Sequence, residues 1–307
     1  MEIGIYIPQV GLGFEDILAR ARRCEALGFS SFWVFDHLYA PGLPEQPALE
    51  GWTLATALLA RTSTLRVGHL VLDNNLRHPA LVAKMATTLD VISGGRLELG
   101  VGSGSYELEH HEGGFPWGPM AERSERLAEG LEIMTRMLRA DRRPFAGRHY
   151  RMDGLPNLPP PVQDPHPPIH VGGAGALTLP IVARYADVWN VPTYALGDWP
   201  ARSAALEEAC AACDRDPATL RRSLETVLVL APTDAELVEA RAKAERRYQG
   251  PAWGLAAGGF VGTPAAIVER LAAEAARGID LVVFFLADRG EHEMLELLAA
   301  EVLPHVR

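Results

Sequence analysis

The chain has 307 residues, of which 48% are hydrophobic, and it carries a formal net charge of −10. That length suffices for one large α/β domain or two ordinary ones, and the negative charge argues against nucleic acid or an anionic membrane as the main partner. No apolar run approaches the roughly 20 residues that span a bilayer, and the N-terminus lacks the basic region of a signal peptide. We therefore expect a cytoplasmic protein that acts on a small molecule.

Strand and helix patterns alternate along the first half of the chain. We expect short apolar strands at residues 3–8, 32–35, 65–72 and 96–101. Helical spacing follows them at residues 14–27, 52–61, 79–92 and 121–138. Gly28 is a good C-cap for the first of these helices, and Pro79 suits the first turn of the third.

The second half repeats the alternation between irregular segments. Strands are expected at residues 169–171, 187–190, 224–231 and 281–286, each followed by a helix. Proline and glycine interrupt the pattern, and we expect insertions at about residues 103–120, 142–167 and 249–262. The middle one has the composition of an ordered, extended excursion. Since none of them resembles a flexible linker, we expect a single domain over residues 1–307.

Eight successive strand–helix units predict a (β/α)₈ TIM barrel with its insertions at the C-terminal face of the strands. A doubly wound sheet is the competing fold, but its glycine-rich turn usually follows the first strand, where this chain has Pro8-Gln9-Val10-Gly11. A barrel places its active site at the C-terminal ends of the strands. That rule selects Asp36 and His37, residues 70–75, residues 102–106, the turn after the fifth strand, and Asn190.

Glycines directly follow the fifth predicted strand. Residues 168–175 read Pro-Ile-His-Val-Gly-Gly-Ala-Gly, and a helical pattern follows over residues 177–185. Such a turn leaves unpaired backbone N–H groups at the positive end of a helix dipole, which suits a phosphate. The alternative is a tight βα turn in which glycine only permits an unusual dihedral angle.

Longer motifs cover the whole chain in order. They are residues 26–29, 33–38, 77–80, 89–104, 145–163, 168–173, 183–190 and 262–264. In type and order these motifs resemble the bacterial luciferase-like monooxygenases and their coenzyme F420-dependent oxidoreductases. The resemblance implies a (β/α)₈ barrel with an extra insertion region, a pocket for reduced FMN or F420 at the strand ends, and a homodimer.

The resemblance also implies roles for individual residues. Asp36 and His37 match the position where F420-dependent relatives contact the deazaflavin and the substrate. His37 would then exchange a proton with the substrate, because histidine titrates near neutral pH. Asp36 would hydrogen-bond the deazaflavin ring or fix the neighbouring imidazole.

The family's cofactor contacts can be carried over in the same way. They include a non-prolyl cis peptide bond, which falls here at Leu70–Val71, and the end of the fourth strand at Gly102. The cofactor phosphate would lie on the turn after the fifth strand, at Gly172, Gly173, Ala174, Gly175 and Thr178.

The choice of cofactor depends on finer features. Residues 35–38, Phe-Asp-His-Leu, resemble the F420 branch, and the Lys-poor composition suggests a GC-rich genome, where F420 is frequent. We therefore expect hydride transfer between C5 of F420 and a small organic substrate. The alternatives are a reduced-FMN-dependent monooxygenase and a non-catalytic flavin-binding barrel. Ser105 stands where some F420-dependent sugar-phosphate and alcohol dehydrogenases carry Glu, which puts those activities in doubt.

The remaining motifs do not predict a metal site. A metal-dependent hydrolase barrel usually needs an HxH pair on its first strand, and this strand has no histidine. Cys210 and Cys213 form an isolated CxxC on a predicted helix, for which packing is the default interpretation. His69 and His170 are expected inside or around the barrel, whereas His110 and His111 would line the substrate mouth. The insertions also hold aromatic residues that suggest either a flat substrate or lid packing: Phe115, Trp117, Trp253 and Phe260.

Overall fold

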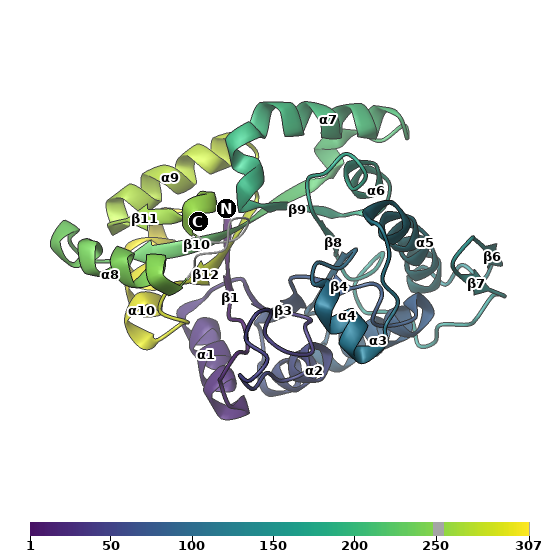
Figure 1. Ribbon diagram of the computed structural model, residues 1–307, viewed down its shortest axis with the longest axis horizontal. Helices are drawn as coiled ribbons and strands as arrows, with labels where there is room; N and C mark the ends of the chain where they lie inside the picture. Colours follow the sequence, from purple (N-terminus) through teal and green to yellow (C-terminus); the bar gives the residue numbers. More distant parts are fainter. Residues whose placement is uncertain (248–254, 307) are drawn as a thin grey trace.

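A computed structural model describes residues 1–247 and 255–306 of the chain. Among these residues, eight parallel strands form a closed barrel, because the sheet runs from β10 through β12 and β1 round to β9, and β9 pairs again with β10. Figure 1 shows helices around the outside of this ring. The barrel strands are β1 (Glu2–Tyr6), β2 (Ser31–Val34), β3 (Arg66–His69), β5 (Leu97–Gly102), β8 (Ile169–Gly172), β9 (Val188–Pro192), β10 (Arg221–Leu230) and β12 (Leu281–Leu286). The predicted TIM barrel is confirmed.

The helices follow the strands as the sequence predicts, and the predicted ends agree with the structure to within two residues. They are α1 (Phe14–Leu27), α2 (Gly51–Arg61), α3 (Pro79–Ser93), α4 (Glu107–Gly113), α5 (Met120–Leu138), α6 (Leu179–Tyr185), α7 (Trp199–Ala211), α8 (Asp234–Arg247), α9 (Pro264–Ala276) and α10 (His292–Glu301). Gly28 ends α1 in the left-handed conformation with φ of 81°, as a C-cap glycine should. None of the helices described is long and apolar enough to cross a membrane.

Side chains that point inward fill the barrel. One apolar group comprises Tyr6, Trp33, Phe35, Leu70, Leu281 and Val283. Deeper in the barrel the carboxylate of Glu98 accepts hydrogen bonds from Arg66 and from His170, whose Nε2 lies 2.7 Å from Glu98 Oε2. Burial alone would raise the pKa of Glu98, but His170 and Arg66 outweigh it and hold that pKa below its usual value. His170 is therefore a partnered core histidine.

The insertions contain structure that hydrophobic periodicity did not predict. Residues 103–120 include the short helix α4, and residues 142–167 include an antiparallel hairpin of β6 (Phe145–Ala146) and β7 (Arg151–Met152). The latter segment is ordered, as expected, because Asp90 accepts hydrogen bonds from the backbone amides of Val162 and Gln163. Two short strands were also missed: β4 (Leu72–Asp73) and β11 (Phe260–Gly262). Residues 249–254 of the third predicted insertion lie outside the described residues.

Candidate functional site

A cavity of about 510 Å³ opens at the C-terminal ends of the barrel strands. That volume falls in the range of small-molecule sites. It is lined by every residue for which the family resemblance implies a role: Asp36, His37, Leu70, Val71, Gly102, Gly172, Gly173, Ala174, Gly175 and Thr178. Of the other residues that the strand-end rule selected, Asn74, Asn75 and Tyr106 are not part of its lining. A larger open groove of about 1500 Å³ lies between α8 and α10 and includes none of them. The strand-end rule therefore gathers the candidates into one place.

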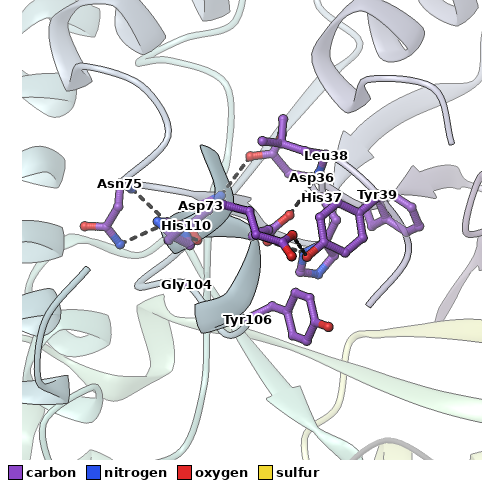
Figure 2. Close-up of polar contacts among 12 residues, drawn as sticks. Asp36, His37, Leu38, Tyr39, Asp73, Asn75, Gly104, Tyr106 and His110 are labelled. Atoms are coloured by element: carbon purple, nitrogen blue, oxygen red, sulfur yellow. Dashed lines mark hydrogen bonds and ion pairs between the residues drawn. The ribbon is translucent and has the colours of Figure 1, made fainter. Parts of the chain in front are cut away.

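His37 follows β2, and its partner comes from α4. The Nδ1 atom of His37 lies 2.7 Å from Oε1 of Glu109, whose other carboxylate oxygen accepts the backbone N–H of Leu38 at 3.0 Å. Glu109 is buried, whereas 22% of the His37 side chain is exposed. The ring of Tyr106 lies 6.3 Å from the ring of His37, and Figure 2 shows the two side chains close together. Glu109 thus orients the imidazole while the rest of the ring faces the cavity.

Asp36 pairs with Arg77 instead of with the neighbouring His37. Its two carboxylate oxygens lie 2.7 and 2.8 Å from the terminal guanidinium nitrogens of Arg77, and Oδ2 also accepts the backbone N–H of Asp73. Asp36 is only 4% exposed, so this is a buried bidentate ion pair. The interpretation that Asp36 fixes the His37 ring is wrong, because Glu109 does so.

His110, the neighbour of Glu109 on α4, is also tied to the barrel. Its Nε2 lies 2.8 Å from Oδ2 of Asp73, and its Nδ1 lies 2.9 Å from the carbonyl oxygen of Pro116. Asp73 Oδ1 accepts two further hydrogen bonds, from the backbone and side chain of Asn75 (Figure 2). His110 is fully buried, so the expectation that it lines the substrate mouth is wrong. Its second nitrogen faces a carbonyl acceptor, which makes this ring a structural anchor for α4.

The aromatic residues of the first insertion pack on that anchor. The rings of Phe115 and Trp117 lie 6.3 and 4.7 Å from the His110 ring, and the Arg123 guanidinium stacks over Trp117 at 3.8 Å. Neither aromatic side chain lines the cavity. Lid packing accounts for them, so they give no evidence of a flat substrate. Phe260 is likewise buried, against Phe284, and Trp253 lies outside the described residues.

The wall between β3 and β5 has the predicted cis peptide bond. The bond Leu70–Val71 is cis, as the resemblance implied. Gly102 on β5 faces Val71 so closely that a Cβ atom at position 102 would lie 2.6 Å from Val71 Cγ2. Glycine at this position therefore allows β5 to accept the protruding Val71 side chain.

The turn after β8 presents backbone groups to the cavity. Gly173 has φ of 121°, which side-chain-bearing residues rarely adopt, and its N–H donates to the carbonyl oxygen of Asn190. The amides of Ala174 and Gly175 make no hydrogen bond within the described part of the chain. Arg202 of α7 donates to the carbonyl oxygen of Ala174 at 2.7 Å, which brings a positive charge beside the turn. The helix α6 begins at Leu179 instead of the expected residue 177, because residues 176–178 form a turn.

Glu225 is a cavity residue that sequence reasoning missed. It lies in the middle of β10, in register with Pro192 of β9 and Val283 of β12, and its side chain lines the cavity. Burial raises the pKa of Glu225 to about 7. An acidic residue within the predominantly apolar run of residues 224–231 was the signal that could have revealed it.

A closed (β/α)₈ barrel with a cavity at its strand ends is the architecture of an enzyme-type small-molecule site. Comparison with known protein families then gives the particular group. Residues 1–281 match the model of the luciferase-like monooxygenases, and the chain belongs to this family.

Individual relatives agree with that assignment. An F420-dependent hydroxymycolic acid dehydrogenase of Mycobacterium tuberculosis is 28% identical over 229 residues, 74% of this chain and 62% of the relative. An F420-dependent glucose-6-phosphate dehydrogenase of Amycolatopsis mediterranei is 30% identical over 191 residues, 61% of this chain and 54% of the relative. The matched regions thus span about half to three-fifths of these curated relatives.

A solved structure shares the fold over the full length. An F420-dependent secondary alcohol dehydrogenase in complex with an F420–acetone adduct superposes with a TM-score of 0.81 and 19% identity, covering 100% of this chain and 99% of that one. At this identity the likeness shows the fold alone.

Proposed function

We propose that this protein is an F420-dependent oxidoreductase that transfers a hydride between C5 of the deazaflavin and a small organic substrate. The observation that carries the proposal is the convergence of the glycine turn, the Leu70–Val71 wall and the His37–Glu109 pair on one cavity of about 510 Å³. The F420-dependent names of both curated relatives support the choice of cofactor. The proposal includes a cytoplasmic, single-domain protein that forms a homodimer.

The residues present fit such a cofactor. The amides of Ala174 and Gly175 and the nearby Arg202 guanidinium suit its phosphate, since these donors and this charge attract an anion. Leu70, Val71 and Gly102 would contact the ring system of the cofactor, and Asp36 would form part of the cavity wall beside it. Thr178 would form the wall at the phosphate end. When bound, the deazaflavin supplies the hydride acceptor or donor.

His37 handles the proton in this mechanism. When a hydroxyl substrate is oxidised, its carbon-bound hydrogen leaves as a hydride and its hydroxyl proton passes to the ring nitrogen of His37 that faces the cavity. Glu109 holds the other nitrogen and favours the positive charge that develops on the ring. In the reverse direction His37 returns the proton to the carbonyl oxygen.

A reduced-FMN-dependent monooxygenase is the second candidate, because the family carries that name and a phosphate on the turn does not distinguish the two cofactors. Titration of the purified protein with F420 and with FMN, each followed by fluorescence, separates the candidates. We expect saturable binding of F420. Tight binding of FMN without any response to F420 would overturn the proposal.

The phosphate site has its own test in the variant Gly173→Ala. A side chain at φ of 121° is strained, and its Cβ would lie 3.1 Å from Thr178 Cγ2, so the turn must change shape. We expect the affinity for F420 to fall about tenfold, because the changed turn would lose a hydrogen bond to the charged phosphate. Affinity for the deazaflavin fragment that lacks the phosphate should stay unchanged, and an equal loss for both ligands would contradict the assignment.

A further inference from the structure

Three carboxyl side chains line the cavity, and they differ in their partners. Asp36 is held by Arg77, and Asp73 is held by His110 and Asn75. The side chain of Glu225 makes no hydrogen bond and no ion pair with any residue that the structure describes. Glu225 is half-buried at the cavity, and polar groups withdrawn from solvent normally have a partner, so this carboxyl calls for an explanation.

The described neighbours of Glu225 include no cation that would compensate a carboxylate. On β9 its neighbours are Asn190 and Pro192, and on β12 they are the apolar Val283 and Phe285. Tyr6 of β1 is also close to Glu225. Its own burial and the negative charge of a Glu225 carboxylate both raise the pKa of the Tyr6 hydroxyl, well above the usual value. Since burial also raises the pKa of Glu225 itself to about 7, much of this carboxyl carries its proton at neutral pH. A protonated carboxyl is a hydrogen-bond donor.

A permanent positive charge is absent from the described lining of the cavity. Among the residues that the structure places around it, none is lysine or arginine, and residues 248–254, outside that description, contain neither type. The cofactor phosphate would occupy the backbone donors of the turn. A second anionic group in the remaining space would meet Glu225 and, among the described lining residues, no lysine or arginine. The charge that develops on His37 is already paired with Glu109, so this partly buried site is unfavourable for a further anion.

We propose that Glu225, in its protonated form, donates a hydrogen bond to a hydroxyl or carbonyl oxygen of an uncharged substrate, and that the cavity rejects phosphorylated substrates. This inference rests on the proposed function, because it concerns the substrate half of the same cavity. Glu225 is then a residue that determines specificity, whereas His37 exchanges the proton. The substrate class is an uncharged alcohol or the corresponding ketone or aldehyde.

The experiment compares wild-type protein with Glu225→Gln, Glu225→Leu and the control Glu269→Gln, an exposed site on α9. Affinity for F420 is measured first by fluorescence and should be equal in all four proteins. Oxidation of cyclohexanol, glucose and glucose 6-phosphate is then followed through the absorbance of F420, from pH 6 to pH 8.5. These probes include a matched pair that differs only in the phosphate.

We expect turnover of the uncharged probes and none of glucose 6-phosphate. The KM of the wild-type protein should rise about tenfold between pH 6 and pH 8.5, as Glu225 loses its proton, which corresponds to about 1.4 kcal/mol. The side-chain amide introduced by Glu225→Gln still donates a hydrogen bond, so this variant should keep a low KM that no longer depends on pH. Glu225→Leu should raise KM about tenfold at pH 6 with little change in kcat.

A measurement without cofactor or substrate reads the protonation of Glu225 directly. Because its pKa is raised on folding, the contribution of Glu225 to stability falls as pH rises from about 4.5 to about 7 and then stays at its low value. The Tm of Glu225→Gln should therefore exceed that of the wild type by at least about 2 °C at pH 8.5, and by less at pH 5.5. The control Glu269→Gln should show no such trend.

The outcomes separate the two proposals. Failure of the wild-type protein to bind F420 would overturn the proposed function and this inference with it. Normal F420 binding together with a loss of kcat in Glu225→Gln of 100-fold or more would show a base instead of a donor, and it would overturn only the inference. Three other results would also overturn only the inference. They are unchanged KM values and pH profiles in the variants, a preference for glucose 6-phosphate, and no turnover of either uncharged probe.

Discussion

The Nδ1 atom of His37 and the Oε1 atom of Glu109 lie 2.7 Å apart, although 72 positions separate the two residues along the chain. His37 follows β2, and Glu109 belongs to the short helix α4 after β5. The insertion after β5 therefore supplies part of the candidate site as well as covering it. His110, the next residue, anchors the same helix to Asp73.

Removal of the Glu109 carboxylate should disturb the orientation of His37. We expect Glu109→Gln to lower kcat about 10- to 100-fold, because a positioned acid–base group contributes about 10²–10⁴-fold and this variant keeps the imidazole but loses its charged partner. Nitrogen NMR of the His37 ring should show a changed tautomer balance.

Glu107→Gln is the matched control for that prediction. Glu107 lies on the same helix but is exposed, and it pairs with His111. The positioning role would be refuted if both variants lost activity equally or if the His37 tautomer stayed as in the wild type.

The buried pair of Arg77 and Asp36 should be costly to break. In Arg77→Met the Asp36 carboxylate stays buried without a cation, so we expect the free energy of unfolding to fall by about 3–5 kcal/mol. Urea denaturation measures this loss, and adding Asp36→Asn to the variant should recover part of it. Arg143→Met removes an exposed pair with Asp141 and should cost less than about 1 kcal/mol. Similar losses in the two single variants would contradict the assignment.

The close approach of Gly102 to Val71 predicts a local steric effect. We expect Gly102→Ala to destabilise the protein by about 1–3 kcal/mol, because the new methyl group would overlap Val71. Val71→Ala in the same chain should relieve much of the loss. Thermal unfolding tests both variants, with Gly197→Ala as the control, since nothing lies within 4 Å of a Cβ at position 197. A Val71→Ala change without any rescue would show that the contact is not the cause.

The pairing of Glu98 with Arg66 and His170 inside the barrel predicts that the stability of the fold depends on pH. The folded protein lowers the pKa of Glu98, so this carboxylate stabilises the fold above its unfolded pKa of about 4.5 and ceases to do so as pH falls through the lower folded value. We expect Glu98→Gln to cost about 1–3 kcal/mol at pH 7 and progressively less below pH 4.5. Urea denaturation at pH 7 and pH 3.5 measures the difference. The prediction would be refuted if the wild type and Glu98→Gln differed in free energy of unfolding by the same amount at both pH values.

Hydrophobic periodicity was enough to predict the barrel strands and their helices. Local features such as Gly28 and Pro79 mark helix ends by their own backbone preferences, so they act without distant contacts. Helix α4 was missed because a seven-residue segment, Glu-Leu-Glu-His-His-Glu-Gly, has no apolar face that periodicity can reveal. It is held by the contacts of Glu109 and His110 with the barrel.

The sequence by itself determined the barrel, the family and the residues at the strand ends, because each depends on local patterns or on motifs read in order. Only the tertiary structure decided how those residues are paired. It paired His37 with Glu109 and Asp36 with Arg77, and it placed Glu225 in the cavity without a side-chain partner among the described residues. Closing the barrel brings residues from distant parts of the chain to within hydrogen-bond range, and no periodicity along a sequence encodes which of them meet.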